Sequence, residues 1–263
     1  MTSYTELLAS LNRHDDHSIE AHIPETWMQG RTTYGGLTAA LSLQGALGLV
    51  DDLPIRTAQV AFVGPVGGDV VIKPTLLRRG KNTAFVSVDI VAESGVTAQS
   101  IFAFGKARQS AQHFDDMPMP DVRGPNEIKS FFREGPRPGF TQNFDMKGVL
   151  GDPPISASTS KSIGLWMRHL DPAAPKDATA VLAIGDAPPP AVMSMLKEPA
   201  RISSMTWMAE FMTDTIATDP EGWFFAQSTA QLAKDGYSSQ SMRLWNRQGE
   251  PVLVGRQTIA VFG

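Results

Sequence analysis

Hydrophobic and polar positions alternate along most of the chain, and the first half also contains one clear helical pattern. From Leu37 to Gly48, apolar residues recur at helical spacing behind the pair Gly35-Gly36, which predicts a long helix. A short helical stretch is also predicted for 4–11, and a strand for 22–27. After the long helix the period changes to two, and four strands are predicted: 58–63, 69–78, 83–93 and 98–106. A helix followed by four antiparallel strands forms a compact α+β unit.

The second half repeats this order of elements. Alternation at 140–149 and a strand-like run at 162–170 come first, and a short helix is predicted for Ala191–Leu196, because the prolines at 188–190 suit the positions at a helix start. Four strands follow: 205–212, 223–233, 238–246 and 252–261. Gly95 and Gly249, which lie 154 residues apart, both fall in the turn before the last strand of their half.

This order predicts a tandem duplication, in which each unit is a helix wrapped by a curled antiparallel sheet. The expected fold is α+β, a double hotdog. The expected organisation is an N-terminal unit at 1–110, a Pro-rich linker at 111–139 and a C-terminal unit at 140–263.

Composition excludes several classes of function. With 23 Lys and Arg against 27 Asp and Glu, the net charge of −4 gives no basic surface for nucleic acid. The absence of Cys removes thiol nucleophiles and Cys-ligated metals. No apolar run reaches the ~20 residues of a membrane span, and the N-terminus has no signal-peptide pattern, so we expect a cytoplasmic protein without membrane partners.

Six short motifs carry a family resemblance: Thr33–Leu37, Ala61–Val66, Leu77–Asn82, Leu165–Arg168, Ile184–Pro189 and Gly249–Thr258. In this order and spacing the chain resembles the acyl-CoA thioesterase II family, the TesB-like double-hotdog thioesterases, over roughly His17 to Gly263. The resemblance implies hydrolysis of the thioester of an acyl-coenzyme A to a free carboxylic acid and coenzyme A, without a metal or other cofactor.

The resemblance also implies a set of site residues. In the family an Asp, a Thr or Ser and a Gln hold a water, and backbone N–H groups at a helix start receive the thioester oxygen. Matched by position, the Thr falls on Thr229, the Gln on Gln257 and the helix start on Gly35 and Gly36. The Asp falls on Thr206, which can orient a water but is not a base near neutral pH.

The missing carboxylate leaves two functions open: a thioesterase with an altered site, or a non-catalytic binder of acyl-CoA or another acyl ligand. A scaffold without a small ligand is a third. Glu210 lies about 13 Å from Thr206 along an ideal strand, too far to replace the Asp. Asp214 and Asp235 fall at loop or strand-end positions. The observation that separates the first two functions is whether a carboxylate approaches Thr229 and Gln257 in the folded chain.

Three further expectations concern partners and symmetry. Arg78, Arg79 and Lys81 cluster at a turn, where they suit either the phosphates of coenzyme A or a solvated hairpin. Exposed edge strands are commonly covered by association, which predicts a homodimer or a higher oligomer. Gln99 is offset from Gln257 by 158 residues instead of 154, so we expect one complete polar set in the chain.

Overall fold

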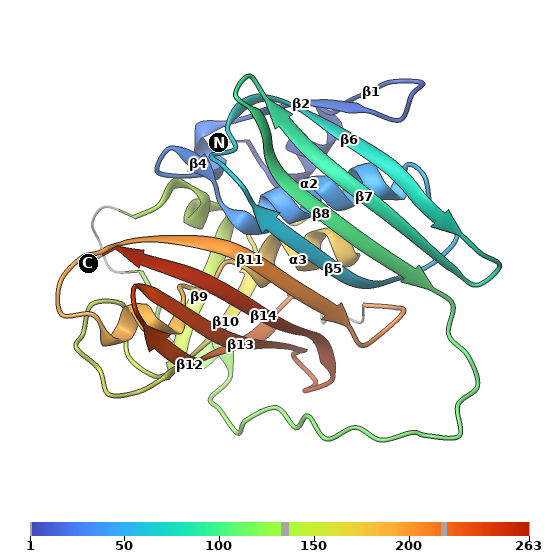
Figure 1. Cartoon of the computed structure of the whole chain (residues 1–263). Coiled ribbons are helices and arrows are strands. Elements are labelled where there is room, and N and C mark those ends of the chain that lie inside the picture. Colours follow the sequence, from blue (N-terminus) through green and yellow to red (C-terminus); the bar gives the residue numbers. More distant parts are fainter. Residues whose placement is uncertain (1, 133–136, 217–219, 263) are drawn as a thin grey trace.

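The computed structural model describes residues 2–132, 137–216 and 220–262. A curved antiparallel sheet of 12 strands covers two central helices, and both halves of the chain contribute to this sheet (Figure 1). Each half adds one of the two central helices and a run of strands. Buried residues of both halves form one hydrophobic core beneath the sheet.

The first half supplies eight strands, two α-helices and a 3₁₀ turn. In chain order these are α1 (Tyr4–Ala9), β1 (Asn12–Arg13), β2 (Ile19–Ile23), η1 (Glu25–Trp27), β3 (Met28–Gln29), β4 (Thr32–Thr33), α2 (Gly35–Leu47), β5 (Ile55–Phe62), β6 (Gly68–Arg79), β7 (Thr83–Ala92) and β8 (Gly95–Gly105). The strand predicted for 22–27 ends at Ile23, where the chain turns into η1. The long helix and the four following strands lie where the alternation predicts them.

The second half is joined to the first by a segment with little regular structure. Its elements are η2 (Pro125–Glu127), η3 (Gly139–Asn143), β9 (Phe144–Leu150), β10 (Ser162–His169), α3 (Ala178–Gly185), η4 (Ala191–Met195), β11 (Arg201–Phe211), β12 (Phe224–Lys234), β13 (Tyr237–Asn246) and β14 (Pro251–Phe262).

The helix predicted for Ala191–Leu196 is wrong. The helix of the second half is α3, which precedes the prolines, and 191–195 forms only the 3₁₀ turn η4. Residues Thr179 to Gly185 of α3 are all buried, so the helix has no polar face and leaves no helical period in the sequence. The side chain of Asp177 marks its start by accepting hydrogen bonds from the backbone N–H groups of Thr179 and Ala180.

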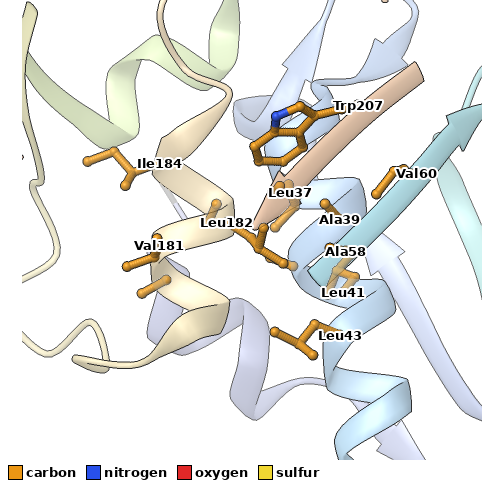
Figure 2. Close-up of a cluster of buried hydrophobic side chains, with 14 of the residues drawn as sticks. Leu37, Ala39, Leu41, Leu43, Ala58, Val60, Val181, Leu182, Ile184 and Trp207 are labelled. Atoms are coloured by element: carbon orange, nitrogen blue, oxygen red, sulfur yellow. The ribbon is translucent and has the colours of Figure 1, made fainter. Parts of the chain in front are cut away.

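The sheet has the strand order β1-β2-β6-β7-β8-β5-β11-β14-β13-β12-β10-β9. The halves meet where β5 pairs antiparallel with β11, with Val60 opposite Trp207. Under this junction α2 and α3 pack against each other, with Leu37 and Leu41 near Leu182 and with Trp207 above them (Figure 2). Replacing either of these fully buried α2 leucines by Ala is expected to cost about 2–5 kcal/mol.

The connecting segment packs against the outer face of the second half. Residues 106–124 contain no helix or strand and run along the margin of the molecule in Figure 1. Two buried tryptophans hold this segment by their indole N–H groups. Trp166 donates to the carbonyl of Arg123 and Trp245 to that of Met117, each at 2.8 Å. Within the described ranges, no helix has the length and apolar character needed to cross a lipid bilayer.

Candidate active site at the start of the first central helix

The start of α2 takes its hydrogen-bond acceptor from the other half of the chain. Tyr34, which precedes the helix, gives no side-chain cap, and the backbone N–H of Gly36 donates to the carboxylate of Asp186. A Cβ atom at Gly35 would lie 2.4 Å from Asp186 Oδ2 and 2.8 Å from Phe62 Cζ. Glycine is therefore required at position 35 because the carboxylate and an aromatic ring occupy the space of a side chain.

Close packing fixes this helix start against α3. A Cβ atom at Gly36 would lie 2.6 Å from the carbonyl oxygen of Ala183. The hydroxyl of Tyr34 donates to the same carbonyl, and its ring stacks on Phe140 with a centroid distance of 4.3 Å. Burial, with the nearby Asp186 charge, raises the pKa of Tyr34 well above its ordinary value, so the hydroxyl remains a proton donor.

Asp186 is the only site carboxylate in contact with Gln257 among the described hydrogen bonds. It follows the last residue of α3, and its Oδ1 accepts a hydrogen bond from Gln257 Nε2 at 2.7 Å. Burial raises the pKa of Asp186 to about 7, although hydrogen bonds from Gln257 and the Gly36 N–H favour its charged form. A carboxylate with this pKa both accepts and releases a proton near neutral pH.

Gln257 links Asp186 to a serine. It lies in β14 opposite Trp207, is 2% exposed, and uses its Nε2 atom again to donate to Ser204 Oγ at 2.9 Å. The two N–H bonds of the amide are thus directed to Asp186 and Ser204. The resulting polar set combines a carboxylate, a hydroxyl and an amide at the positive end of a helix.

Ser204 reaches this face because β11 is irregular. The register between β11 and β14 shifts between Ser204 and Thr206, as in a β-bulge. Ser204 and Trp207 therefore both face the helices, while Met205 and Thr206 are exposed. Thr206, which matches the Asp position of the family, pairs with Ala61 and points away from Gln257.

Thr229 also lies away from Gln257. Thr229 pairs with Ser241, which in turn pairs with Arg256, so Thr229 lies on the same face of the sheet as Arg256. Gln257 follows Arg256 in β14, and neighbouring residues of a strand point to opposite faces. The side chains of Thr229 and Gln257 therefore lie on opposite faces of the sheet. The Thr229 hydroxyl hydrogen-bonds to that of Ser162 at 2.8 Å. Of the predicted polar residues, the structure brings only Gln257 to the start of α2.

The other acids considered from the sequence are placed elsewhere. Asp214 forms an ion pair with Arg56, and Asp235 lies 3.7 Å from Lys234. Glu210 shares the outward-facing side of β11 with Met208 and Thr206. Sequence reasoning assigned no role to Asp186 or Ser204. Asp186 stands inside the motif Ile184–Pro189, but the misplaced helix concealed its position at a helix end.

The predicted phosphate-binding cluster consists of Arg78, Arg79 and Lys81. Arg79 forms an ion pair with Asp52 at 2.6 Å. Pairing through β7 aligns Arg79 with the Phe104 end of β8, whereas Phe62, which touches Gly35, pairs with Ala98 at the other end. These ends are about 20 Å apart along a strand. The cluster is not next to Asp186.

Solved structures with this architecture are hotdog proteins. A conserved protein of unknown function with a hotdog fold from Alicyclobacillus acidocaldarius is 22% identical, with a TM-score of 0.89, over 100% of this chain and 99% of that one. A putative thioesterase II from Thermobifida fusca YX is 19% identical, with a TM-score of 0.83, over 100% of this chain and 98% of that one. The acyl-CoA thioesterase II TesB2 from Mycobacterium marinum is 17% identical, with a TM-score of 0.77, over 98% of each chain. These likenesses confirm the predicted α+β double hotdog.

Two family models then assign the chain within this class. The acyl-CoA thioesterase N-terminal domain matches residues 23–105, and the acyl-CoA thioesterase C-terminal domain matches residues 113–261. The chain belongs to the acyl-CoA thioesterase family, which confirms the resemblance seen in its motifs. No curated protein sequence matches it.

Proposed function

We propose that this protein hydrolyses the thioester of an acyl-coenzyme A with a water held by Asp186, Ser204 and Gln257. The observation that carries the proposal is the 2.7 Å hydrogen bond between Gln257 and Asp186 at the start of α2. It supplies the carboxylate that the family resemblance implies and that the match by position did not find at Thr206. Thr229 and Thr206 have no part in this version of the site.

The proposed reaction uses Asp186 as the general base. Gln257 holds the carboxylate and the Ser204 hydroxyl in fixed positions, so a water between them has a defined direction of attack. As the water oxygen bonds to the thioester carbon, its proton passes to Asp186. We assign the developing negative charge on the carbonyl oxygen to the positive end of α2, where the Gly35 N–H adjoins the one used by Asp186. Cleavage of the carbon–sulfur bond then releases the carboxylic acid, and coenzyme A leaves with the proton from Asp186.

The alternative of a non-catalytic acyl-CoA binder rested on the lack of a base. Asp186, with a pKa of about 7 and direct contact with Gln257, favours hydrolysis over binding alone. The cytoplasmic location, the homodimer or higher oligomer and a role in lipid metabolism remain predictions. We draw no support for coenzyme A phosphate binding from Arg78, Arg79 and Lys81.

The test is release of free coenzyme A from short, medium, long and aromatic acyl-CoA esters, followed with a thiol reagent. The chain has 0 Cys, so the protein adds no thiol background. We expect turnover of at least one ester and a loss of about 10²–10⁴-fold in kcat for Asp186→Asn, the usual contribution of a general base. In the wild type, kcat/KM should fall as the pH drops below the pKa of Asp186, because protonation removes the base.

Thr229→Val and Thr206→Val are the matched controls, since both residues face away from Gln257 and both variants should keep wild-type turnover. Full activity of Asp186→Asn would exclude Asp186 as the base. If no ester is hydrolysed but acyl-CoA binds saturably, the protein is a binder.

A further inference from the structure

A second buried glutamine lies directly behind Gln257. Gln240, in β13, is 1% exposed and pairs with Gln257 across the sheet. Its Nε2 donates to Gln257 Oε1 at 2.7 Å, and its Oε1 accepts from the backbone N–H of Ala191 at 2.9 Å. A buried amide is costly unless its polar atoms are paired, so this arrangement needs a partner on each side of Gln240.

The chain of hydrogen bonds has only one consistent direction. The backbone N–H of Ala191 can only donate, so Gln240 must present its carbonyl oxygen to it. Gln240 then donates from its NH₂ group to Gln257, which must accept this hydrogen bond with its own carbonyl oxygen. The NH₂ group of Gln257 is thereby turned toward Asp186 and Ser204. A backbone group outside the site thus determines which end of the Gln257 amide faces the carboxylate.

We propose that Gln240 is a positioning residue of the thioesterase site, which locks the amide of Gln257 with its N–H groups toward Asp186 and Ser204. The inference rests on the proposed function and deepens it, because it assigns the orientation of a group that touches the base. Gln240 also bonds to η4, five residues beyond Asp186, so the segment from Asp186 to Ala191 is attached to the glutamine pair at both ends.

Loss of this lock would change the proton affinity of Asp186. If the Gln257 amide turns over, its carbonyl oxygen faces the carboxylate, and the two acceptors can share a hydrogen bond only when Asp186 is protonated. Burial and the Gly36 N–H would still act on the carboxyl group as before. The other ionisable group coupled to it is Tyr34, which precedes α2. Turning the amide should therefore raise the pKa of Asp186.

The principal test is Gln240→Met, which keeps the length of the side chain and removes both hydrogen bonds. We expect kcat to fall about 10- to 100-fold, as for other small misplacements of catalytic groups, with KM changed less than about twofold. The acid limb of the pH profile should move to higher pH. Gln240→Glu is the second variant, because an ionised Glu cannot donate to Gln257 and its charge should also move the limb upward.

The pKa of Asp186 can also be read without turnover, by ¹³C NMR titration of labelled Asp carboxyl groups, with Asp186→Asn assigning the signal. Ser238→Ala is the matched control: Ser238 lies two residues away on the same strand, is 2% exposed, and should leave the pKa and kcat unchanged. An upward shift in Gln240→Met supports the lock even if no ester is hydrolysed, in which case only the proposed function fails. An unchanged Asp186 pKa in a folded Gln240→Met protein would overturn the proposal that Gln240 fixes the orientation of the Gln257 amide.

Discussion

The two central helices begin in opposite ways. At α2 the preceding residue gives no side-chain cap, and the Gly36 N–H donates to Asp186 from the other half of the chain. At α3 the preceding Asp177 caps its own helix, accepting from the N–H groups of Thr179 at 2.9 Å and Ala180 at 3.1 Å. The positive end of α3 is thus satisfied locally, whereas that of α2 holds a carboxylate within a larger polar set.

The glutamine and the aspartate at comparable places in the two halves also differ in burial and partners. Gln99, in β8, is exposed and donates to Asp89 at 2.9 Å on the outer face, while Gln257 is buried over the helices. Asp52, which follows α2, pairs with Arg79 at the surface, whereas Asp186 follows α3 and reaches the other helix. Within the described residues, duplication of the fold therefore does not duplicate the polar set of Asp186, Ser204 and Gln257. The set needs a helix start from one half and polar side chains from the other.

The largest effect that we expect from the buried carboxylate at the start of α2 is on the stability of the folded protein. The pKa of Asp186 is about 7 in the folded protein against 3.8 for a free side chain. Between these values the folded state retains a proton that the unfolded state releases, so stability should fall as pH rises through this window. We expect Asp186→Asn to remove this fall and to be more stable than the wild type at about pH 8, by on the order of a few kcal/mol.

Urea unfolding at about pH 4 and about pH 8 measures this difference, and the two proteins should be most alike at the lower pH. The same pH dependence in both proteins would show that burial of Asp186 has no such cost. The variant should gain stability while it loses turnover, the usual conflict at a site that buries a charge.

A smaller effect is expected when the space for the carboxylate is filled. Gly35→Ala would place a Cβ atom where Asp186 Oδ2 and the ring of Phe62 now lie. We expect a loss of about 10- to 100-fold in kcat, because the base is displaced. Overpacking should also lower the free energy of unfolding by about 1–3 kcal/mol, part of which the higher helix propensity of Ala offsets. Steady-state kinetics and urea unfolding measure the two. The reverse exchange at the first residue of α3, Ala178→Gly, is the control and should leave turnover unchanged.

The smallest effect is expected at the self-capped helix. Asp177→Ala removes the acceptor at the start of α3 and should lower the free energy of unfolding by about 1 kcal/mol. Turnover should be retained, because no group of the proposed site touches this helix start. Asp177→Asn keeps an acceptor and should stay near wild-type stability in thermal unfolding. A large loss of turnover in Asp177→Ala would contradict the expectation that the start of α3 takes no part in catalysis.

The sequence predicted most of the fold because most elements have one buried and one exposed face. The strands of both halves show this alternation, and α2 shows a helical spacing behind its glycines. The helix α3 was missed because residues 179–185 are all buried, which leaves an apolar run without a period. The prolines at 188–190 suggested a helix start, although they follow the helix.

The sequence by itself determined the duplicated fold, the family and the helix start at Gly35 and Gly36, and it singled out Gln257 as a candidate site residue. Only the tertiary structure placed Asp186 and Ser204 beside Gln257. Strict alternation puts Ser204 and Thr206 on one face of β11, and a register shift between them turns Ser204 inward and leaves Thr206 exposed. Asp186 is 71 residues from Gln257 along the chain, and the two meet only because α3 ends where α2 begins. Such contacts depend on how strands and helices stack, a property that no local pattern of residues records.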